Sequence, residues 1–309
     1  MAGVEGGAWV RAWCRQQLGA EPLEELFRTG HLSMVVGLRL ANDRQVVIKA
    51  RPAPSLERLA GCVAVQQALA LAGFPCPRPL AGPHRLGRLL VTAEELVAGG
   101  ERLAEKADAA ARFAGLLAEL VRLAPPPSAV PPLGPSPPWV GWDRQGTGLW
   151  PEADDLDADL NRHLGPGWLD EAAARVRARL AGVRLAAVVG HGDWESQNIR
   201  WRGRRPWVVH DWDSVVAQPE AAIAGQAAAV WPAAGGPGEA ASVAQTEQFL
   251  GAYAQARGRP WTRTEHEVAW AAGLWVRCFN AKKDAVVGGG PQLDRLAGEV
   301  AARSRNAAI

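Results

Sequence analysis

The chain has 309 residues, of which 48% are hydrophobic, so it can bury a substantial core in one two-lobed domain or in two small domains. Its net charge of +2 is too small to indicate nucleic-acid binding, and its apolar stretches are too short or too interrupted to indicate a membrane span. The N-terminus shows no basic segment followed by an apolar run, and the four cysteines lack paired metal-ligand spacing, so we expect a cytoplasmic protein with reduced thiols.

The first third of the chain predicts a small sheet with helices. The expected elements are a helix at 9–28, strands at 34–40 and 45–49, a helix at 55–72, an extended connector at 74–80 and a strand at 89–93. Glu21 and Pro22 interrupt the first helical pattern. Ser55 is a candidate N-cap of the second helix, and Gly73 is its expected stop.

The remaining two thirds predict mostly helices. They follow, in chain order, as a helix at 103–123, an extended proline-rich segment at 124–142, an acidic run at 150–159, a helix at 169–182, strands at 186–189, 199–201 and 207–209, and helices near 221–230, 240–257, 264–283 and 292–303. After Asp213 the sequence indicates helices alone. Strands come first and helices mostly later, which is typical of α+β proteins.

The two strands at 199–201 and 207–209 indicate a hairpin that gathers oxygen-bearing side chains. Asn198 lies just before the first strand and Asp211 just after the second. Because paired antiparallel strands lie roughly 5 Å apart, both side chains can reach one hard cation. Asp193, in the loop before the hairpin, is free to face whatever that cation holds.

Lys49 ends an apolar strand, where a lysine must point outward or find an anion. The loop that precedes the first strand contains Gly30 and Ser33, and its backbone N–H groups could cover phosphates. Each feature alone also fits a role unrelated to nucleotide binding. Lys49 would then be a charged residue at the edge of a sheet, and the loop would be an ordinary turn.

Residues 191–193 (His-Gly-Asp), followed by Asn198 and then by Asp211 after a Val-Val-His strand, resemble a motif of the aminoglycoside phosphotransferase and choline kinase-like family of small-molecule kinases. The order of the Gly30 loop, Lys49 and a Glu-Glu linker, and the connector at 73–80, follow the same layout. The resemblance implies an α+β, bilobal protein kinase-like fold. An N-terminal nucleotide-binding lobe with an antiparallel sheet would cover 1–95, and a mainly helical catalytic and acceptor-binding lobe would cover 96–309, with the linker at about 94–100.

The same resemblance implies a role for each motif residue. Asn198 and Asp211 would hold Mg²⁺ on the phosphates of ATP or GTP, and Asp193 would take the proton of the acceptor hydroxyl. Lys49 would hold the α- and β-phosphates. The groups expected to bind the rest of the nucleotide are those of the phosphate loop and of the linker backbone, namely Gly30, Ser33, Glu94, Glu95 and Leu96. His191 is expected to orient the loop, and His210 to be an ordinary strand residue.

Three positions depart from the family pattern. The helix after the lysine strand carries no glutamate near 62–66 to pair with Lys49, and Glu57 lies a turn or more too early. Leu120 and Val121 stand where the long helix usually ends in Leu-His, and residues 219–222 lack the aspartate of a Pro-x-x-Asp motif. These departures concern residues that support the site rather than those that react.

Carboxylates near the catalytic loop are candidates for binding the acceptor. They are Asp154, Asp155 and Asp157 of the acidic run, together with Glu195 and Asp213. If they bind substrate, the acceptor is cationic; the alternatives are a solvated helix start for the run, a surface role for Glu195, and a second metal or a solvated carboxylate for Asp213. An aromatic wall is a further candidate, made of Trp139, Trp142, Trp150 and Trp168.

The sequence therefore predicts a kinase that phosphorylates a hydroxyl of a small molecule, with antibiotic inactivation, and hence resistance, as the first choice of role. A metabolic kinase for an amino alcohol, sugar or nucleoside is the second. A nucleotide-binding regulator that has lost phosphoryl transfer is the alternative from another class. We expect a monomer or a weak homodimer, without nucleic-acid or membrane partners.

Overall fold

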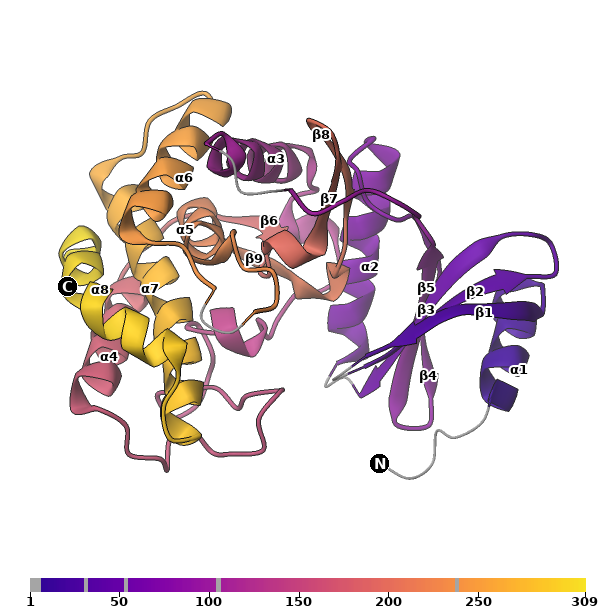
Figure 1. Ribbon diagram of the computed structural model, residues 1–309, viewed down its shortest axis with the longest axis horizontal. Coiled ribbons are helices and arrows are strands. Elements are labelled where there is room, and N and C mark those ends of the chain that lie inside the picture. The colour runs from indigo at the N-terminus through magenta and orange to yellow at the C-terminus, as the bar shows by residue number, and fades with distance from the viewer. Residues whose placement is uncertain (1–6, 31–32, 53–54, 104–106, 237–238) are drawn as a thin grey trace.

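The computed structural model describes residues 7–30, 33–52, 55–103, 107–236 and 239–309. An N-terminal part built on an antiparallel sheet is followed by a larger and mainly helical C-terminal part (Figure 1). The expectation of strands first and helices mostly later is confirmed. Within the described residues, no helix combines the length and the apolar character that crossing a membrane requires.

The N-terminal part contains one five-stranded sheet. Its elements are α1 (Gly7–Leu18), β1 (Pro22–Thr29), β2 (Met34–Leu40), β3 (Gln45–Pro52), α2 (Leu56–Leu71), β4 (Pro79–Leu86) and β5 (Leu89–Glu95). The strand order is β1-β2-β3-β5-β4, and every neighbouring pair is antiparallel. Strand β3, which carries Lys49, therefore lies in the middle of the sheet, beside β5.

Alternation along the central strands separates the two faces of this sheet. One face packs with α1 in a core that includes Val36, Leu38, Leu40, Val46, Ile48, Ala50, Val91 and Ala93. Lys49 and Glu94 occupy intervening positions, so their side chains leave the sheet on the other face, toward α2 and the C-terminal part. Figure 1 shows α2 standing between the sheet and the C-terminal part.

Helix α2 begins and ends as its sequence predicts. The Ser55 side chain accepts a hydrogen bond from the backbone N–H of Arg58, and Gly73, just past the helix, adopts φ +84°. The buried side of α2 joins the hydrophobic core of the C-terminal part through Leu59, Cys62 and Val65. The helix is thus a shared wall between the two parts.

The C-terminal part is organised around its longest helix, α7. Its elements are α3 (Ala109–Leu123), η1 (Pro127–Ala129), η2 (Pro138–Val140), α4 (Gly167–Ala181), β6 (Ala187–His191), η3 (Ser196–Asn198), β7 (Ile199–Arg202), β8 (Arg205–Val209), η4 (Trp212–Ser214), β9 (Val215–Pro219), α5 (Glu220–Val230), α6 (Val243–Ala256), α7 (Arg263–Val286) and α8 (Pro291–Ala307). Helix α7 packs against α4, α5 and α8. A Cβ on Gly225 of α5 would lie 1.8 Å from the carbonyl oxygen of Ala269, so α5 and α7 cross at a distance that only glycine permits.

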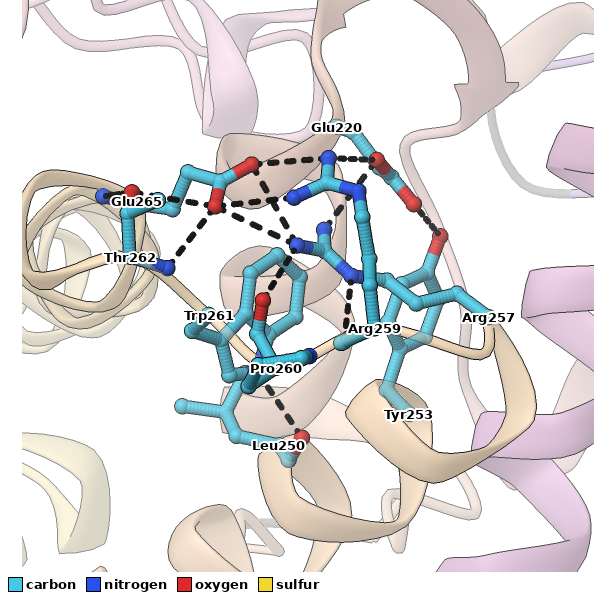
Figure 2. A network of polar contacts seen from close by, with 9 residues as sticks. All are labelled: Glu220, Leu250, Tyr253, Arg257, Arg259, Pro260, Trp261, Thr262 and Glu265. Carbon is cyan, nitrogen blue, oxygen red and sulfur yellow. Dashed lines mark hydrogen bonds and ion pairs between the residues drawn. The ribbon is translucent and has the colours of Figure 1, made fainter.

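A cluster of charged and aromatic residues ties α5, α6 and α7 together. Arg257, at the end of α6, is only 5% exposed and forms ion pairs with Glu220 at 3.1 Å and with Glu265 at 3.2 Å. Its guanidinium carbon lies 3.6 Å from the centre of the Trp261 ring. Figure 2 shows Arg259 reaching the same two carboxylates, and Arg259 is the more exposed of the two arginines. We call these four charged residues the Arg257 cluster.

Two predictions for the start of the chain need correction. The helix expected over 9–28 ends at Leu18, because Gly19 adopts φ +70° and Pro22 follows, and residues 22–29 form β1. β1 is an edge strand and is exposed along nearly its whole length, so its sequence lacks the alternation that identifies a half-buried strand.

Other elements also differ from expectation. β4, an edge strand with irregular register, was not expected, and β9 precedes the helices that follow Asp213. Helix α3 begins at Ala109 rather than at Leu103, and residues 104–106 of the expected helix lie outside the described residues. β9 is defined by its pairing with β6, which joins His191 to Val215, and such long-range pairing is invisible in local sequence.

Candidate active site

The hairpin at the centre of the sequence prediction is present. Strands β7 and β8 are antiparallel, Ile199 pairs with Val209, and Gly203 takes φ +60° in the turn. The backbone N–H of His210 donates to the carbonyl of Asn198 at 2.8 Å. The two ends of the hairpin therefore meet, and the residues that flank it, Asn198 and Asp211, are held next to one another.

Asp193 is fixed against Asn198 by two hydrogen bonds. The Asn198 Nδ2 donates to Asp193 Oδ2 at 2.7 Å and to the Asp193 carbonyl at 3.0 Å. This contact uses the amide nitrogen of Asn198 and leaves its oxygen for another partner. Asp211 adopts φ +66° and accepts a hydrogen bond from Ser214 Oγ at 2.8 Å. The three predicted residues thus come together at the end of one hairpin.

His191 fixes the backbone of this loop through two hydrogen bonds. Its Nδ1 accepts from the backbone N–H of Asp193 at 3.2 Å, so the neutral ring donates from Nε2 to the carbonyl of His210 at 3.0 Å. Burial lowers the pKa of His191, and its ring packs edge-on against Trp194 and Trp212. This geometry agrees with the orienting role expected for His191.

A cleft of about 1030 Å³ is lined by Asp193 and Asp211, whereas Asn198 contacts Asp193 and is not among the lining residues. The N-terminal part contributes Ser33, Arg51, Ser55, Arg58 and Leu59, and the C-terminal part contributes Trp139, Glu152, Asp154, Asp155, Asp193, Glu195, Asp211, Asp213 and Lys283. Lys49 and Glu94 line a smaller cavity of about 20 Å³, which shares Arg51, Leu59 and Asp213 with the cleft. The structure places Asp157 on the surface and does not bring it to the cleft.

Three carboxylates of the cleft have raised pKa values. Burial, together with the carboxylates of Glu195 and Asp211, raises the pKa of Asp193 well above its usual range. Burial raises the pKa of Glu195 to about 7, and burial and Asp155 raise the pKa of Asp154. We call Asp154, Asp193 and Glu195 the cleft carboxylates. A cation bound here would stabilise the ionised form of each.

Asp211 differs from its neighbours. Burial alone would raise its pKa, but the charge of Lys49 and the hydrogen bond from Ser214 are among the contributions that outweigh burial, and the pKa of Asp211 is lowered. Its carboxylate is therefore ionised at neutral pH and available to a cation.

The loop predicted to cover phosphates is partly described. Gly30 takes φ +142°, and a Cβ there would lie 1.7 Å from the carbonyl oxygen of Ser33. The close approach requires glycine at this position. Ser33 lines the cleft, whereas residues 31–32 of the loop lie outside the described residues.

Lys49 has a partner that the sequence did not reveal. Its Nζ lies 2.9 Å from Glu94 Oε1, and Gln66 Nε2 donates to Glu94 Oε2 at 2.9 Å. Glu57, the nearest candidate from the sequence, is exposed in the first turn of α2. The signal for Glu94 was the pair of polar residues, Glu94 and Glu95, that closes an apolar strand.

The linker backbone is already engaged in this structure. The N–H of Glu95 donates to the carbonyl of Arg78 at 2.9 Å, and the N–H of Leu96 donates to the carbonyl of Gln45 at 3.0 Å. These two donors are not free for adenine here, so adenine binding by the linker stays a prediction.

Two arginines that the sequence prediction did not include connect the parts across the cleft. Arg51, two residues after Lys49 on β3, forms an ion pair with Asp213. Arg58 of α2 donates to the carbonyls of Asp213 at 2.8 Å, Val215 at 3.0 Å and Pro135 at 2.7 Å. Asp213 lines the cleft as a substrate residue should, but Arg51 occupies its carboxylate.

The expected aromatic wall is reduced to one member. Trp139 lines the cleft, and its indole N–H donates to the carbonyl of Gly192 at 2.8 Å. Trp150 is fully buried against Trp275, and neither Trp142 nor Trp168 is among the described residues that line the cleft. The prediction was wrong for Trp150, since a tryptophan in a polar stretch can still turn its ring into the core.

Comparison with known proteins gives a match over most of the chain. The model of a family described as the phosphotransferase enzyme family matches residues 25–263. No curated protein sequence matches the chain significantly.

Solved structures with related folds extend over nearly the whole chain. A thermostable mutant of aminoglycoside phosphotransferase APH(4)-Ia, in a ternary complex with ADP and hygromycin B, has a TM-score of 0.58 at 14% identity and covers 97% of this chain and 99% of its own. Macrolide 2'-phosphotransferase MphH from Brachybacterium faecium has 0.53 at 18% identity, covering 98% and 97%. Amicoumacin kinase hAmiN, in complex with AMP-PNP, Ca²⁺ and Ami, has 0.60 at 11% identity, covering 99% and 92%. These similarities confirm the bilobal protein kinase-like fold.

Proposed function

The chain belongs to the phosphotransferase enzyme family, and from that premise we propose that it transfers the γ-phosphate of a magnesium-bound nucleotide, ATP or GTP, to a hydroxyl group of a small molecule. The observation that carries this proposal is the meeting of Asp193, Asn198 and Asp211 at one hairpin end, with Asp193 and Asp211 on the wall of the cleft. The N-terminal lobe, residues 1–95, would bind the nucleotide. The lobe at 96–309 would carry catalysis and bind the acceptor, with the linker at about 94–100.

The donor set fits Mg²⁺. Asn198 offers an amide oxygen, and Asp211 offers a carboxylate whose pKa is lowered. Among the residues that the structure describes, no group of three or more His, Cys, Asp or Glu side chains is arranged to hold a metal ion. Mg²⁺ usually takes one or two protein ligands and completes its shell with phosphate oxygens and water. Asn198 and Asp211 would hold the ion, which supplies neutralisation of phosphate charge when bound.

Asp193 is the proposed catalytic base. Its hydrogen bonds with Asn198 fix the direction of its carboxylate in the cleft. It would accept a hydrogen bond from the acceptor hydroxyl and take the proton as the hydroxyl oxygen bonds to the γ-phosphorus and the nucleoside diphosphate leaves. Positioning of the hydroxyl, more than strong basicity, is what phosphoryl transfer requires of this residue.

Lys49 and the Gly30 loop would hold the phosphates from the opposite side. Lys49 projects from the central strand β3, and Ser33 lines the cleft beside Arg51. Arg51 adds a second cation that can face phosphate oxygens once a nucleotide competes with Asp213 for it.

The acceptor is proposed to carry a positive charge. Glu152, Asp154 and Glu195 line the C-terminal side of the cleft, and burial already raises the pKa values of the last two. A cationic group would stabilise their ionised forms. The antibiotic phosphotransferases among the similar structures support an antibiotic as the acceptor. A metabolic acceptor, such as an amino alcohol or a sugar amine, fits the same charges and is the second candidate.

The test is nucleotide consumption across a panel of aminoglycosides, basic peptide antibiotics, amino alcohols and uncharged sugars and nucleosides, with wild type and Asp193→Ala side by side. We expect acceptor-dependent turnover by the wild type and its loss in the variant. Binding of magnesium-nucleotide without turnover on any acceptor would favour a regulator. Turnover confined to uncharged acceptors would contradict the role of the acidic lining.

A further inference from the structure

The register of the sheet brings Lys49 and Glu94 together. On the paired strands β3 and β5, Lys49 lies opposite Thr92 and Val47 lies opposite Glu94. Lys49 and Glu94 are therefore diagonal neighbours on one face, within reach of each other's long side chains. The Nζ–Oε1 distance of 2.9 Å shows that the pair is formed.

The carboxylate of Glu94 is bound at both oxygens. Lys49 pairs with Oε1, while Gln66 donates to Oε2 at 2.9 Å and also to the carbonyl of Pro77 at 2.9 Å. Glu94 is 6% exposed and Gln66 is 4% exposed. The two bonds of Gln66 lock its amide, and the amide in turn locks the plane of the carboxylate.

Helix α2 offers no competing carboxylate. Its acidic residue, Glu57, lies in the first turn and is exposed, whereas Gln66 lies more than two turns further along and faces the sheet. The position of α2 that contacts Glu94 thus holds a neutral amide, and the negative charge beside Lys49 comes from β5.

Lys49 lies where the sheet, α2 and the C-terminal part meet. It lines a small cavity together with Gln66 and Glu94, and Trp212 and Asp213 line the same cavity. Its side chain is only 13% exposed. The ammonium group therefore lies next to the residues that follow Asp211 in the chain.

We infer that Glu94 is a positioning residue, which acts through Lys49 to hold the ammonium group where it meets the nucleotide phosphates, with Gln66 fixing the carboxylate from α2. The inference rests on the proposed function, because it takes Lys49 to be a nucleotide ligand. It gives the Glu94 side chain a role that differs from backbone contact with adenine.

The experiment measures the affinity of magnesium-AMP-PNP by titration calorimetry, so it needs no knowledge of the acceptor. The variants are Glu94→Gln, Lys49→Ala, the double variant of both, and Glu57→Gln as a matched control that removes the exposed glutamate of α2. Thermal melting of each variant separates loss of fold from loss of binding.

We expect E94Q to weaken nucleotide binding by roughly 10–100-fold, because Lys49 loses its anchor, and E57Q to bind like the wild type. The double variant should bind no more weakly than K49A alone, since Glu94 acts through Lys49. Rescue in Q66E/E94Q, which returns a carboxylate from α2, would support the same reading.

Wild-type affinity in E94Q would overturn the inference, and so would additive losses in the double variant, because Glu94 would then act independently of Lys49. Failure of the proposed function looks different. In that case the wild type itself binds no magnesium-nucleotide, or K49A binds as well as the wild type.

Discussion

The Arg257 cluster and the cleft carboxylates are two places where acidic side chains gather, and they differ in the partners that these carboxylates have. In the Arg257 cluster, Glu220 and Glu265 face two guanidinium groups (Figure 2). Burial would raise the pKa of Glu265, but hydrogen bonds from Arg259 and Thr262 and the charge of Arg257 lower it to about 2.

In the cleft, the same kind of residue is left with raised pKa values, at Asp154, Asp193 and Glu195. Buried charges are stable only when they are paired. The carboxylates of the Arg257 cluster are paired with arginines of the protein itself, whereas the cleft carboxylates would be stabilised in their ionised form by a bound cation. A group of acidic side chains is therefore not by itself a sign of a binding site. Carboxylates that lie in a cleft with raised pKa values do indicate one.

The largest expected effect is that of Asp193→Asn on activity. We expect kcat to fall by roughly 10²–10⁴-fold, because the variant cannot take the proton of the acceptor hydroxyl. The thermal midpoint of the protein without nucleotide should stay unchanged or rise, since the substitution removes a carboxylate that its neighbours disfavour. Steady-state kinetics and calorimetry check both. A clear loss of stability would show that Asp193 is a structural residue like those of the Arg257 cluster.

Arg257→Ala should do the reverse. We expect the free energy of unfolding to fall by about 3–5 kcal/mol, because Glu220 and Glu265 lose the buried one of their two arginine partners and keep only the exposed Arg259. The kcat per folded molecule should not change. Arg259→Ala is the matched control, since that side chain is 51% exposed and its loss should cost less than about 1 kcal/mol. Equal losses in urea denaturation of the two variants would contradict the importance of burial.

Acid should unfold the protein partly through Glu265. Its pKa is about 2 in the folded protein and 4.5 as the ordinary value, so it stabilises the fold fully above pH 4.5, and this contribution is lost as the pH falls toward 2. Urea unfolding of wild type and Glu265→Gln at several pH values between about 5.5 and 3 checks this. The wild type should lose stability more steeply. If the free energy of unfolding falls equally with pH in both proteins, residues other than Glu265 cause the acid sensitivity.

Gln66→Ala should give the smallest effect. The Lys49–Glu94 pair persists, but the carboxylate loses one of its two fixed partners, and nucleotide affinity should fall by only about 3–10-fold. Titration with magnesium-AMP-PNP measures it. If this loss equals that of Glu94→Gln, the helix rather than the strand positions Lys49.

The hairpin that carries Asn198 and Asp211 at its ends was predictable because its geometry is local. Gly203 marks the turn, and the strand lengths alone bring Asn198 beside Asp211. The order of Lys49 and the later motifs then predicted two lobes, and the fold agrees. Residues that are close in sequence can be arranged in only a few ways, so their contacts can be predicted from local patterns.

The contacts that the sequence did not predict join residues that are far apart in the chain. Glu94 meets Lys49 only through the register of β3 with β5, and Arg51 meets Asp213 across the whole lobe boundary. In the acidic run, Asp154 lines the cleft and Asp157 does not, because an irregular segment offers no period from which to choose a face. The sequence placed the right charges near the site without saying which of them point into it.

The pairing of Lys49 with Glu94 has a consequence for control of the protein. Where a helix supplies the carboxylate, sliding or rotating that helix can make and break the pair, and a signal can use the movement as a switch. Here both residues belong to adjacent strands of one sheet, so the pair forms when the sheet folds. We therefore expect the proposed phosphotransferase activity to be constitutive. Its rate would depend on the concentrations of nucleotide and acceptor rather than on an activating signal.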